Sequence, residues 1–202
     1  MKSLKLKSYC KINLSLNVIK KLNNGYHNIS SLITFCNLYD EISIRNNKNL
    51  GDKIKFFGEF SKGIDNNSNT ITKLLKLLRI NKLLTNQSFN ILIKKNIPHG
   101  SGLGGGSSNA ATLLNYFNKN KKLNLNKEKI NKLSQLIGFD VPICLEKRNT
   151  FLTGKNREIL RINKNFKLNI LIVYPNLICS TQKIYKKNKK KSLIKPKPNF
   201  NK

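Results

Sequence analysis

The stretch that decides the fold is Pro98-His99-Gly100-Ser101-Gly102-Leu103-Gly104-Gly105-Gly106-Ser107-Ser108-Asn109-Ala110-Ala111. It holds five of the eleven glycines of the chain. Glycine backbone can reach positive φ, and no side chain shields its N–H groups, so an anion can approach them closely. The residues after the glycines are typical of the first turn of a helix, where free N–H donors and a partial positive charge favour a phosphate. The stretch therefore predicts a phosphate-binding loop.

The neighbouring segments place this loop between a strand and a helix. Residues 88–93 have the pattern of a strand and lead directly into the loop. Earlier in the chain an apolar face recurs at helical spacing, and Asn69 stands where that helix would be capped. The face consists of Ile71, Leu74, Leu75 and Leu78. After the loop, a second amphipathic helix ends at Gly138, and its apolar face carries Ile130, Leu133 and Ile137.

The first half of the chain predicts strands in meander-like order. Residues 11–19 alternate with the period of a strand. One face carries Ile12, Leu14, Leu16 and Val18, and the other carries Lys11, Asn13, Ser15 and Asn17. Lys11 and Asn13 are therefore expected side by side on the polar face. An Asn-Gly turn signal follows, and residues 29–35, 41–44 and 53–57 predict further strands.

The residues after Gly138 hold one acidic side chain of interest. Asp140 lies just past the predicted helix end, in a chain with nine acidic residues. Short strands are predicted at 150–152 and around Ile159, and the apolar run 168–174 has the length of another strand. The Lys-rich residues 183–202 show no core-forming period, so most of them are expected to be disordered.

Composition alone does not decide the function. The net charge of +30 would suit a nucleic-acid-binding protein. However, the basic excess is lysine, accompanied by much asparagine and isoleucine, which an A- and T-rich genome would also produce, so nucleic acid is the less favoured partner. No apolar run reaches the roughly 18 residues of a membrane span, and no signal peptide is evident, so a cytoplasmic protein is expected.

The four cysteines and two histidines do not suggest a metal framework. Cys10, Cys36, Cys144 and Cys179 lie far apart in the sequence, without paired ligand spacing. We therefore interpret them as reduced thiols, neither a disulfide nor a zinc site.

Other glycine-rich loops fit the stretch less well. A P-loop ends in Gly-Lys-Ser/Thr, whereas Gly106 is followed by Ser107 and Ser108. Gly100, Gly102 and Gly105 satisfy the G-x-G-x-x-G pattern, but a dinucleotide fold places that pattern after the first strand of a parallel β-α-β unit. A flexible linker is the structural alternative, although a predicted strand and helix flank the stretch.

The stretch resembles the nucleotide-binding motif of the GHMP kinases, a family of small-molecule kinases. Three further segments resemble that family in the same order: Lys11-Ile12-Asn13-Leu14, Gly25-Tyr26-His27 and Gly138-Phe139-Asp140-Val141-Pro142. The combination is more specific than any one segment. It implies an α+β fold, in which an N-terminal GHMP kinase domain of the ribosomal protein S5 domain 2-like type precedes a ferredoxin-like domain.

The resemblance implies a place for ATP and a catalytic pair. ATP would bind to Pro98, His99, Gly100, Ser101, Gly102, Leu103, Gly104, Gly105, Gly106, Ser107 and Ser108. Ser108 would lie near Mg²⁺, and Asn69 would lie at the adenine. Asp140 would be the base that takes the proton of the acceptor hydroxyl, and Lys11 would assist it. Such a base typically contributes ~10²–10⁴-fold in rate, and a neighbouring ammonium keeps it ionised.

The resemblance also implies a substrate class. Gly25-Tyr26-His27 fits the members of the family that phosphorylate a cytidine diphosphate-linked methylerythritol in non-mevalonate isoprenoid synthesis. Tyr26 and Tyr185 would then stack on the cytosine, His27 would bind the edge of the base, and Asn13 would lie near polar groups of the substrate. Stacking is worth ~1–3 kcal/mol per base.

The expected domains are residues 1–160, the kinase N-terminal domain; 161–182, the start of a truncated second domain; and 183–202, the tail. Residues 161–202 are too few for an independent domain. We therefore expect a fragment or an interrupted gene product, in which ATP binding persists better than turnover. Another GHMP small-molecule kinase, a remnant that binds ATP without turnover, and a basic nucleic-acid-binding protein are the alternatives.

Overall fold

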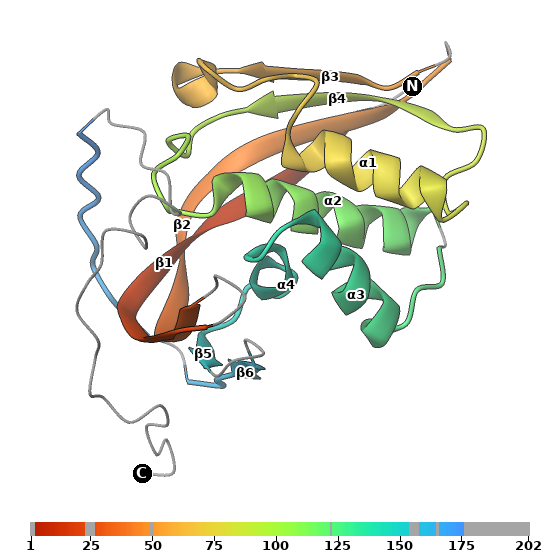
Figure 1. The fold of residues 1–202 in the computed structure, drawn as a ribbon. Coiled ribbons are helices and arrows are strands. Elements are labelled where there is room, and N and C mark those ends of the chain that lie inside the picture. Colours follow the sequence, from red (N-terminus) through yellow and green to blue (C-terminus); the bar gives the residue numbers. More distant parts are fainter. Residues whose placement is uncertain are drawn as a thin grey trace.

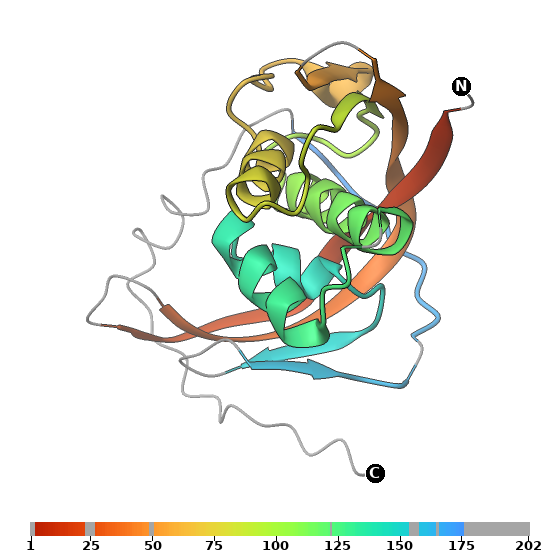
Figure 2. The same ribbon diagram turned by 90° about the vertical axis from the view of Figure 1, so that its right-hand side faces the viewer.

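The computed structural model describes residues 3–22, 27–48, 51–121, 123–153, 158–164 and 166–175. In these residues the chain forms a curved six-stranded sheet with helices packed on one face (Figure 1). The view turned by 90° shows the two long N-terminal strands curving around the helices (Figure 2). The described residues include no helix that is long and apolar enough to cross a membrane.

The sheet is built around one long strand. The strands are β1 (Leu4–Lys21), β2 (His27–Asn47), β3 (Lys53–Phe57), β4 (Ser88–Lys94), β5 (Thr150–Thr153) and β6 (Glu158–Arg161). Their order is β3-β4-β2-β5-β6, and β1 pairs with β2. The strands predicted at 29–35 and 41–44 are therefore one continuous strand. The meander-like order is wrong beyond β2, because β3 pairs in parallel with β4 and both lie at the far edge of the sheet.

The helices follow the predicted pattern closely. They are the short 3₁₀ turn η1 (Glu59–Ser61) and the α-helices α1 (Thr70–Ile80), α2 (Gly105–Asn120), α3 (Lys127–Ile137) and α4 (Val141–Cys144). Asn69 caps α1 as predicted, since its side chain accepts hydrogen bonds from the backbone N–H groups of Ile71 and Thr72. Gly138 ends α3, again as predicted.

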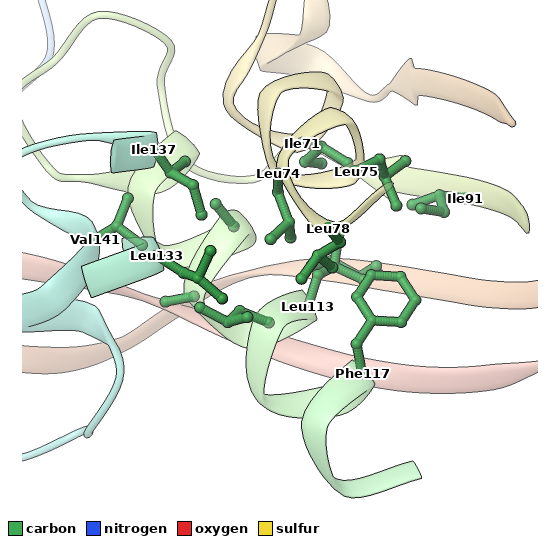
Figure 3. Packing of buried hydrophobic residues seen from close by; sticks show 14 of the residues in the cluster. Ile71, Leu74, Leu75, Leu78, Ile91, Leu113, Phe117, Leu133, Ile137 and Val141 are labelled. Carbon is green, nitrogen blue, oxygen red and sulfur yellow. The ribbon is translucent and has the colours of Figure 1, made fainter. Parts of the chain in front are cut away.

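One apolar core joins α1, α2 and α3 to the sheet. Leu74 and Leu78 on α1, Phe117 on α2 and Ile91 on β4 are completely buried. Figure 3 shows these side chains interdigitating with Leu133 and Ile137 of α3. Burying a leucine or phenylalanine side chain contributes roughly 1.5–3 kcal/mol, so this core fixes α2, and with it the loop that precedes α2, against the sheet.

Lys11 is buried although it lies on the predicted polar face of β1, where Ser15 is exposed. Lys11 is only 6% exposed, whereas Leu14 and Leu16 on the apolar face are 38% and 46% exposed. The alternation predicted the strand correctly, but the usual rule that the apolar face of a strand is the buried one fails here. A lysine is almost never buried without a partner, so its burial points to a polar site on this side of the sheet.

The strand predicted at 168–174 is not formed. Residues 166–175 have no strand pairing in the structure, and Leu171 and Val173 are 89% and 79% exposed. A strand requires a neighbour for its backbone hydrogen bonds, and this segment runs apart from the sheet (Figure 1). The Lys-rich tail and Tyr185 lie outside the described residues, and the domain boundaries stay predictions.

Candidate active site

The glycine-rich loop connects β4 to the N-terminus of α2, as predicted. Gly100, Gly102 and Gly104 have φ angles of 70°, 79° and 72°, which are in the region that favours glycine. Gly104 occupies the N-cap position of α2, and no side chain caps this helix. The first N–H groups of α2 therefore remain open to an anion, and the helix dipole adds a partial positive charge there.

The loop lies directly against Lys11. The backbone N–H of Lys11 donates a hydrogen bond to the carbonyl of Leu103 at 2.9 Å. A Cβ atom on Gly104 would lie only 2.7 Å from Cγ of Lys11. Glycine at this position thus allows the positive φ and leaves room for the Lys11 side chain beneath the loop.

Lys11 and Asp140 form an ion pair, although they are far apart in sequence. Lys11 Nζ lies 3.3 Å from Asp140 Oδ2. The same ammonium donates to Asn13 Oδ1 at 2.7 Å. Asn13 Nδ2 donates in turn to Ser31 Oγ at 2.7 Å, and Ser31 donates to the Ser15 carbonyl at 2.6 Å. This chain of hydrogen bonds fixes the ammonium, and Asp140, whose side chain is 32% exposed, is the more accessible member of the pair.

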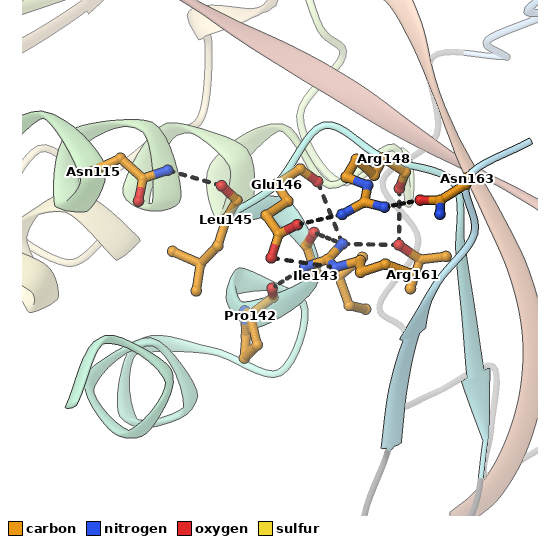
Figure 4. A network of polar contacts seen from close by, with 9 residues as sticks. Asn115, Pro142, Ile143, Leu145, Glu146, Arg148, Arg161 and Asn163 are labelled. Atoms are coloured by element: carbon orange, nitrogen blue, oxygen red, sulfur yellow. Dashed lines mark hydrogen bonds and ion pairs between the residues drawn. The ribbon is translucent and has the colours of Figure 1, made fainter. Parts of the chain in front are cut away.

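Asp140 is positioned by the short helix α4, which it precedes. Arg161, on β6, holds this helix from its other end (Figure 4). Its guanidinium donates to the carbonyl of Ile143 at 2.9 Å, to that of Pro142 at 3.0 Å and to Thr150 Oγ1 at 2.8 Å. Burial lowers the pKa of Arg161, but an arginine remains protonated at neutral pH. A permanent charge on the last strand thus holds the segment that carries Asp140.

Ser108 lies in the first turn of α2, also in contact with β1. It is 3% exposed, and its hydroxyl donates to the Tyr9 carbonyl at 2.6 Å. The oxygen keeps its lone pairs, so Ser108 could contribute one ligand to a cation at the helix N-terminus. Among the residues that the structure describes, no three His, Cys, Asp or Glu side chains gather as a metal-binding group.

A second Lys–Asp pair, not predicted from the sequence, lies beneath the loop. Asp40 is completely buried, and its carboxylate binds the ammonium of Lys95, which is 3% exposed. Asp40 Oδ1 also accepts hydrogen bonds from the backbone N–H groups of Asn96 and Ile97, both at 2.9 Å. Asp40 therefore fixes the chain just before Pro98. Asp40 lies inside β2, and nothing in the sequence around it distinguishes a buried carboxylate from an exposed one.

His99, the second residue of the loop, lies near this pair. Burial, with a smaller contribution from the charge of Lys95, lowers the pKa of His99. The imidazole is therefore neutral at physiological pH, and it adds no positive charge to the loop.

The N-terminus of α1 adjoins the loop on its other side. Thr70 Oγ1 donates to the Gly106 carbonyl at 2.8 Å. An open pocket of about 480 Å³ lies here. It is lined by Asn67, Ser68, Asn69, Thr70, Thr72, Lys73 and Lys76. Asn69, expected at the adenine, thus borders a pocket next to the glycines, although its side-chain oxygen is already occupied as the cap of α1.

Comparison with known proteins agrees with this geometry. The family described as "GHMP kinases N terminal domain" matches residues 69–148, which contain the loop and Asp140. A 4-diphosphocytidyl-2-C-methyl-D-erythritol kinase of Pelagibacter ubique (strain HTCC1062) is 44% identical over 201 residues, which are 100% of this chain and 69% of that protein. The chain belongs to the GHMP kinase family.

Other GHMP kinases support the assignment. The enzyme of the same name from Caldicellulosiruptor bescii is 34% identical over 98% of this chain and 68% of its own length. The crystal structure of a 4-(cytidine 5'-diphospho)-2C-methyl-D-erythritol kinase superposes with a TM-score of 0.63 at 25% identity, over 79% of this chain and 55% of that one. A homoserine kinase from Cytophaga hutchinsonii, 14% identical with a TM-score of 0.57, shares the fold. The α+β kinase fold expected from the sequence is thus confirmed.

This GHMP kinase chain brings together some of the predicted site residues and not others. Lys11 contacts both Asn13 and Asp140 beside the loop. His27 begins β2 at the far end of the β1–β2 hairpin, where it pairs with Lys21. Tyr26 and Tyr185, expected to stack on the cytosine, lie outside the described residues. The roles of all these residues stay predictions.

Proposed function

We propose that the chain transfers the γ-phosphate of ATP to the 2-hydroxyl of 4-diphosphocytidyl-2-C-methyl-D-erythritol. The observation that carries the proposal is the Lys11–Asp140 pair, with its 3.3 Å separation, beside the uncapped N-terminus of α2. A carboxylate and an ammonium next to an anion-binding helix end are what transfer of a phosphoryl group to an alcohol requires. The names of the relatives support the substrate, and this chain spans 69% and 68% of two of them.

Asp140 acts as the general base. Its partly exposed carboxylate accepts the proton of the attacking hydroxyl as the new O–P bond forms. Lys11, which Asn13 holds in place, pairs with that carboxylate and attracts the γ-phosphate. Because Asn13 holds Lys11 and the ion pair with Lys11 holds Asp140, little reorganisation is needed at the moment of transfer.

ATP binds with its triphosphate at the glycine loop and the first turn of α2, and its adenine lies toward Asn69. Ser108 fits the part of a Mg²⁺ ligand because its hydroxyl donates to Tyr9 and keeps lone pairs for a cation. Mg²⁺ is usually held by few protein oxygens together with substrate phosphates. The ion, when bound, would neutralise charge on the transferring phosphate.

The cytidine end of the substrate lies along the β1–β2 hairpin. Asn13 is near its polar groups, His27 binds the edge of the base, and Tyr26 and Tyr185 stack on it. The pairing of β1 with β2 supports this placement because it extends from Lys11, opposite Phe35, to Lys21, opposite His27. The cytoplasmic location expected from the sequence stays a prediction.

A phosphoryl-transfer assay on the purified chain tests the proposal. With Mg²⁺ and labelled ATP, we expect label transfer to 4-diphosphocytidyl-2-C-methyl-D-erythritol and not to mevalonate, homoserine or galactose. Asp140→Asn should abolish transfer. Glu128→Gln, a change at an exposed ion pair on α3, is the matched control and should leave it intact. Faster transfer to one of the other alcohols, or thermal stabilisation by an oligonucleotide but not by Mg-ATP, would overturn the proposal.

A further inference from the structure

The side chain of Cys10, the residue before Lys11, contacts the side chain of Cys36. Cys10 Sγ and Cys36 Sγ are 2.7 Å apart, although 26 positions separate them in the sequence. An S–S bond is ~2.05 Å long, so small movements of the two side chains would bring the sulfurs to bonding distance. Both are free thiols in the structure.

An irregularity in the strand pairing produces this contact. The register of β1 and β2 shifts between Tyr9 and Lys11, so that Cys10 lies opposite a bulge formed by residues 36–38. A bulge turns a side chain away from the regular alternation of a strand and locally increases the twist. Here it aims Cys36 at Cys10.

The two thiols differ in access. Cys10 is completely buried, whereas Cys36 is partly exposed. Burial raises the pKa of the Cys10 thiol well above its usual range, and the hydrogen bond with Cys36 adds to the effect. An oxidant from solvent reaches Cys36 first because Cys36 is the more exposed thiol, and Cys10 reacts with the product because its sulfur lies 2.7 Å away, although its raised pKa makes this second step slow.

We propose that Cys10 and Cys36 form a reversible disulfide under peroxide, and that this bond lowers the activity of the kinase. Hydrogen peroxide oxidises the Cys36 thiol to a sulfenic acid and releases one water. The Cys10 sulfur then attacks the Cys36 sulfur, and the S–S bond forms. The hydroxyl group leaves as a second water with the proton of the Cys10 thiol. Each sulfur loses one electron, and the peroxide gains two.

The bond would act on the site through the backbone of β1. Cys10 stands between Tyr9, whose carbonyl accepts the hydrogen bond of Ser108, and Lys11, which pairs with Asp140. Whatever part of the closure the backbone at Cys10 takes up moves both neighbours with it. Because a displacement of ~1 Å can cost as much as 10²-fold in rate, we expect a fall in kcat of about tenfold, reversed by a thiol reductant.

Peptide mapping tests the bond without reference to activity. The four cysteines fall on four different tryptic peptides: residues 8–11, 22–45, 133–147 and 168–183. After peroxide treatment of the full chain, we expect the peptides 8–11 and 22–45 to be joined and to separate under dithiothreitol. Cys36→Ser should remove this product, whereas Cys179→Ser should leave it. Absence of the 8–11/22–45 pair, or a predominant pair with either other peptide, would overturn the proposal.

The predicted loss of activity rests on the proposed phosphoryl transfer, and it is measured separately from the formation of the disulfide. The treated wild-type chain should lose activity and recover it with dithiothreitol, while Cys36→Ser should keep its activity under the same treatment. If the disulfide forms and activity is unchanged, the inhibitory role is wrong while the proposed function stands. If the untreated chain transfers no phosphate, the mapping result still decides whether the bond forms.

Discussion

Two lysine–aspartate pairs flank the glycine loop, and they differ in access to solvent. In the Lys11–Asp140 pair, the carboxylate is 32% exposed and the ammonium is also held by Asn13. In the Lys95–Asp40 pair, the side chains are 3% and 0% exposed, and the carboxylate additionally binds two backbone N–H groups. The open pair can reach a substrate, whereas the closed pair can act only on the protein itself.

The difference in exposure indicates that the two aspartates at this loop have different roles, one in the reaction and the other in holding the structure. A carboxylate without access to solvent cannot receive a proton from an acceptor alcohol, so Asp40 serves to hold the start of the loop. Removing one member of a buried pair leaves an uncompensated charge, which is strongly destabilising. A partly exposed pair contributes much less to stability. Changing the two aspartates should therefore affect different measurements.

The largest effect is expected from Asp140→Asn. The substitution keeps the size of the side chain and removes the base, so kcat should fall ~10²–10⁴-fold. Because the pair is partly open, the free energy of unfolding should change by about 1 kcal/mol or less. Steady-state phosphoryl transfer and urea unfolding measure the two quantities. A variant that retains more than a tenth of the wild-type kcat would remove Asp140 from the proposed role.

Asp40→Asn should show the opposite profile. The amide still accepts from Asn96 and Ile97, but Lys95 is left without its counter-charge, so we expect a loss of ~3–5 kcal/mol in the free energy of unfolding. Urea unfolding measures it. Combining the change with Lys95→Met should recover part of the loss, since the buried charge is then gone. A loss below about 1 kcal/mol would contradict the architectural role.

Gly104→Ala probes the contact between the loop and the open pair. Alanine at φ 72° costs ~1–2 kcal/mol, and its Cβ would also meet the Lys11 side chain. Gly63→Ala is the matched control, because Gly63 has φ 83° and nothing within 4 Å of the added Cβ. Both variants should lose stability through the positive φ, Gly104→Ala the more because of its contact with Lys11, and only Gly104→Ala should lose kcat. Equal kcat values for the two would indicate that the loop does not position Lys11.

The smallest effect, outside both pairs, is expected from Asn69→Ala. Loss of the cap of α1 should cost ~1 kcal/mol. Asn126→Ala removes the equivalent cap of α3 and serves as the control. If Asn69 also lies at the adenine, only its variant should bind Mg-ATP more weakly, as measured by calorimetry. Identical ATP affinities would assign Asn69 to capping alone.

Local patterns in the sequence predicted those parts of the fold that local forces determine. The caps at Asn69 and Gly138 and the apolar face of α1 follow from helix geometry within a few residues. The glycine cluster likewise marked the loop, because positive φ is a property of single residues. The partnership of Lys11 with Asp140 came only from resemblance to the GHMP kinases, since no local pattern relates residues so far apart.

What the sequence did not predict depends on long-range pairing. Residues 168–174 are apolar enough for a strand, but a strand also requires a free sheet edge beside it. Two other contacts depend on which strands become neighbours. They are the ion pair of Asp40 with Lys95 and the hydrogen bonds from Arg161 to α4. The sequence does not show whether a charged residue is buried, so Asp40, Lys95 and Arg161 were not predicted as positioning residues.

The hydrogen bonds from Arg161 to the backbone of α4 have a consequence for the order of folding. Proteins emerge from the ribosome N-terminus first, and contacts between distant residues form late. The loop with the helix α2 that follows it, Lys11 and the Asp40–Lys95 pair are all complete in the chain by residue 120, whereas Asp140 gains its support only when β6 joins β5. A nascent chain can therefore form its glycine loop before Asp140 is held in place.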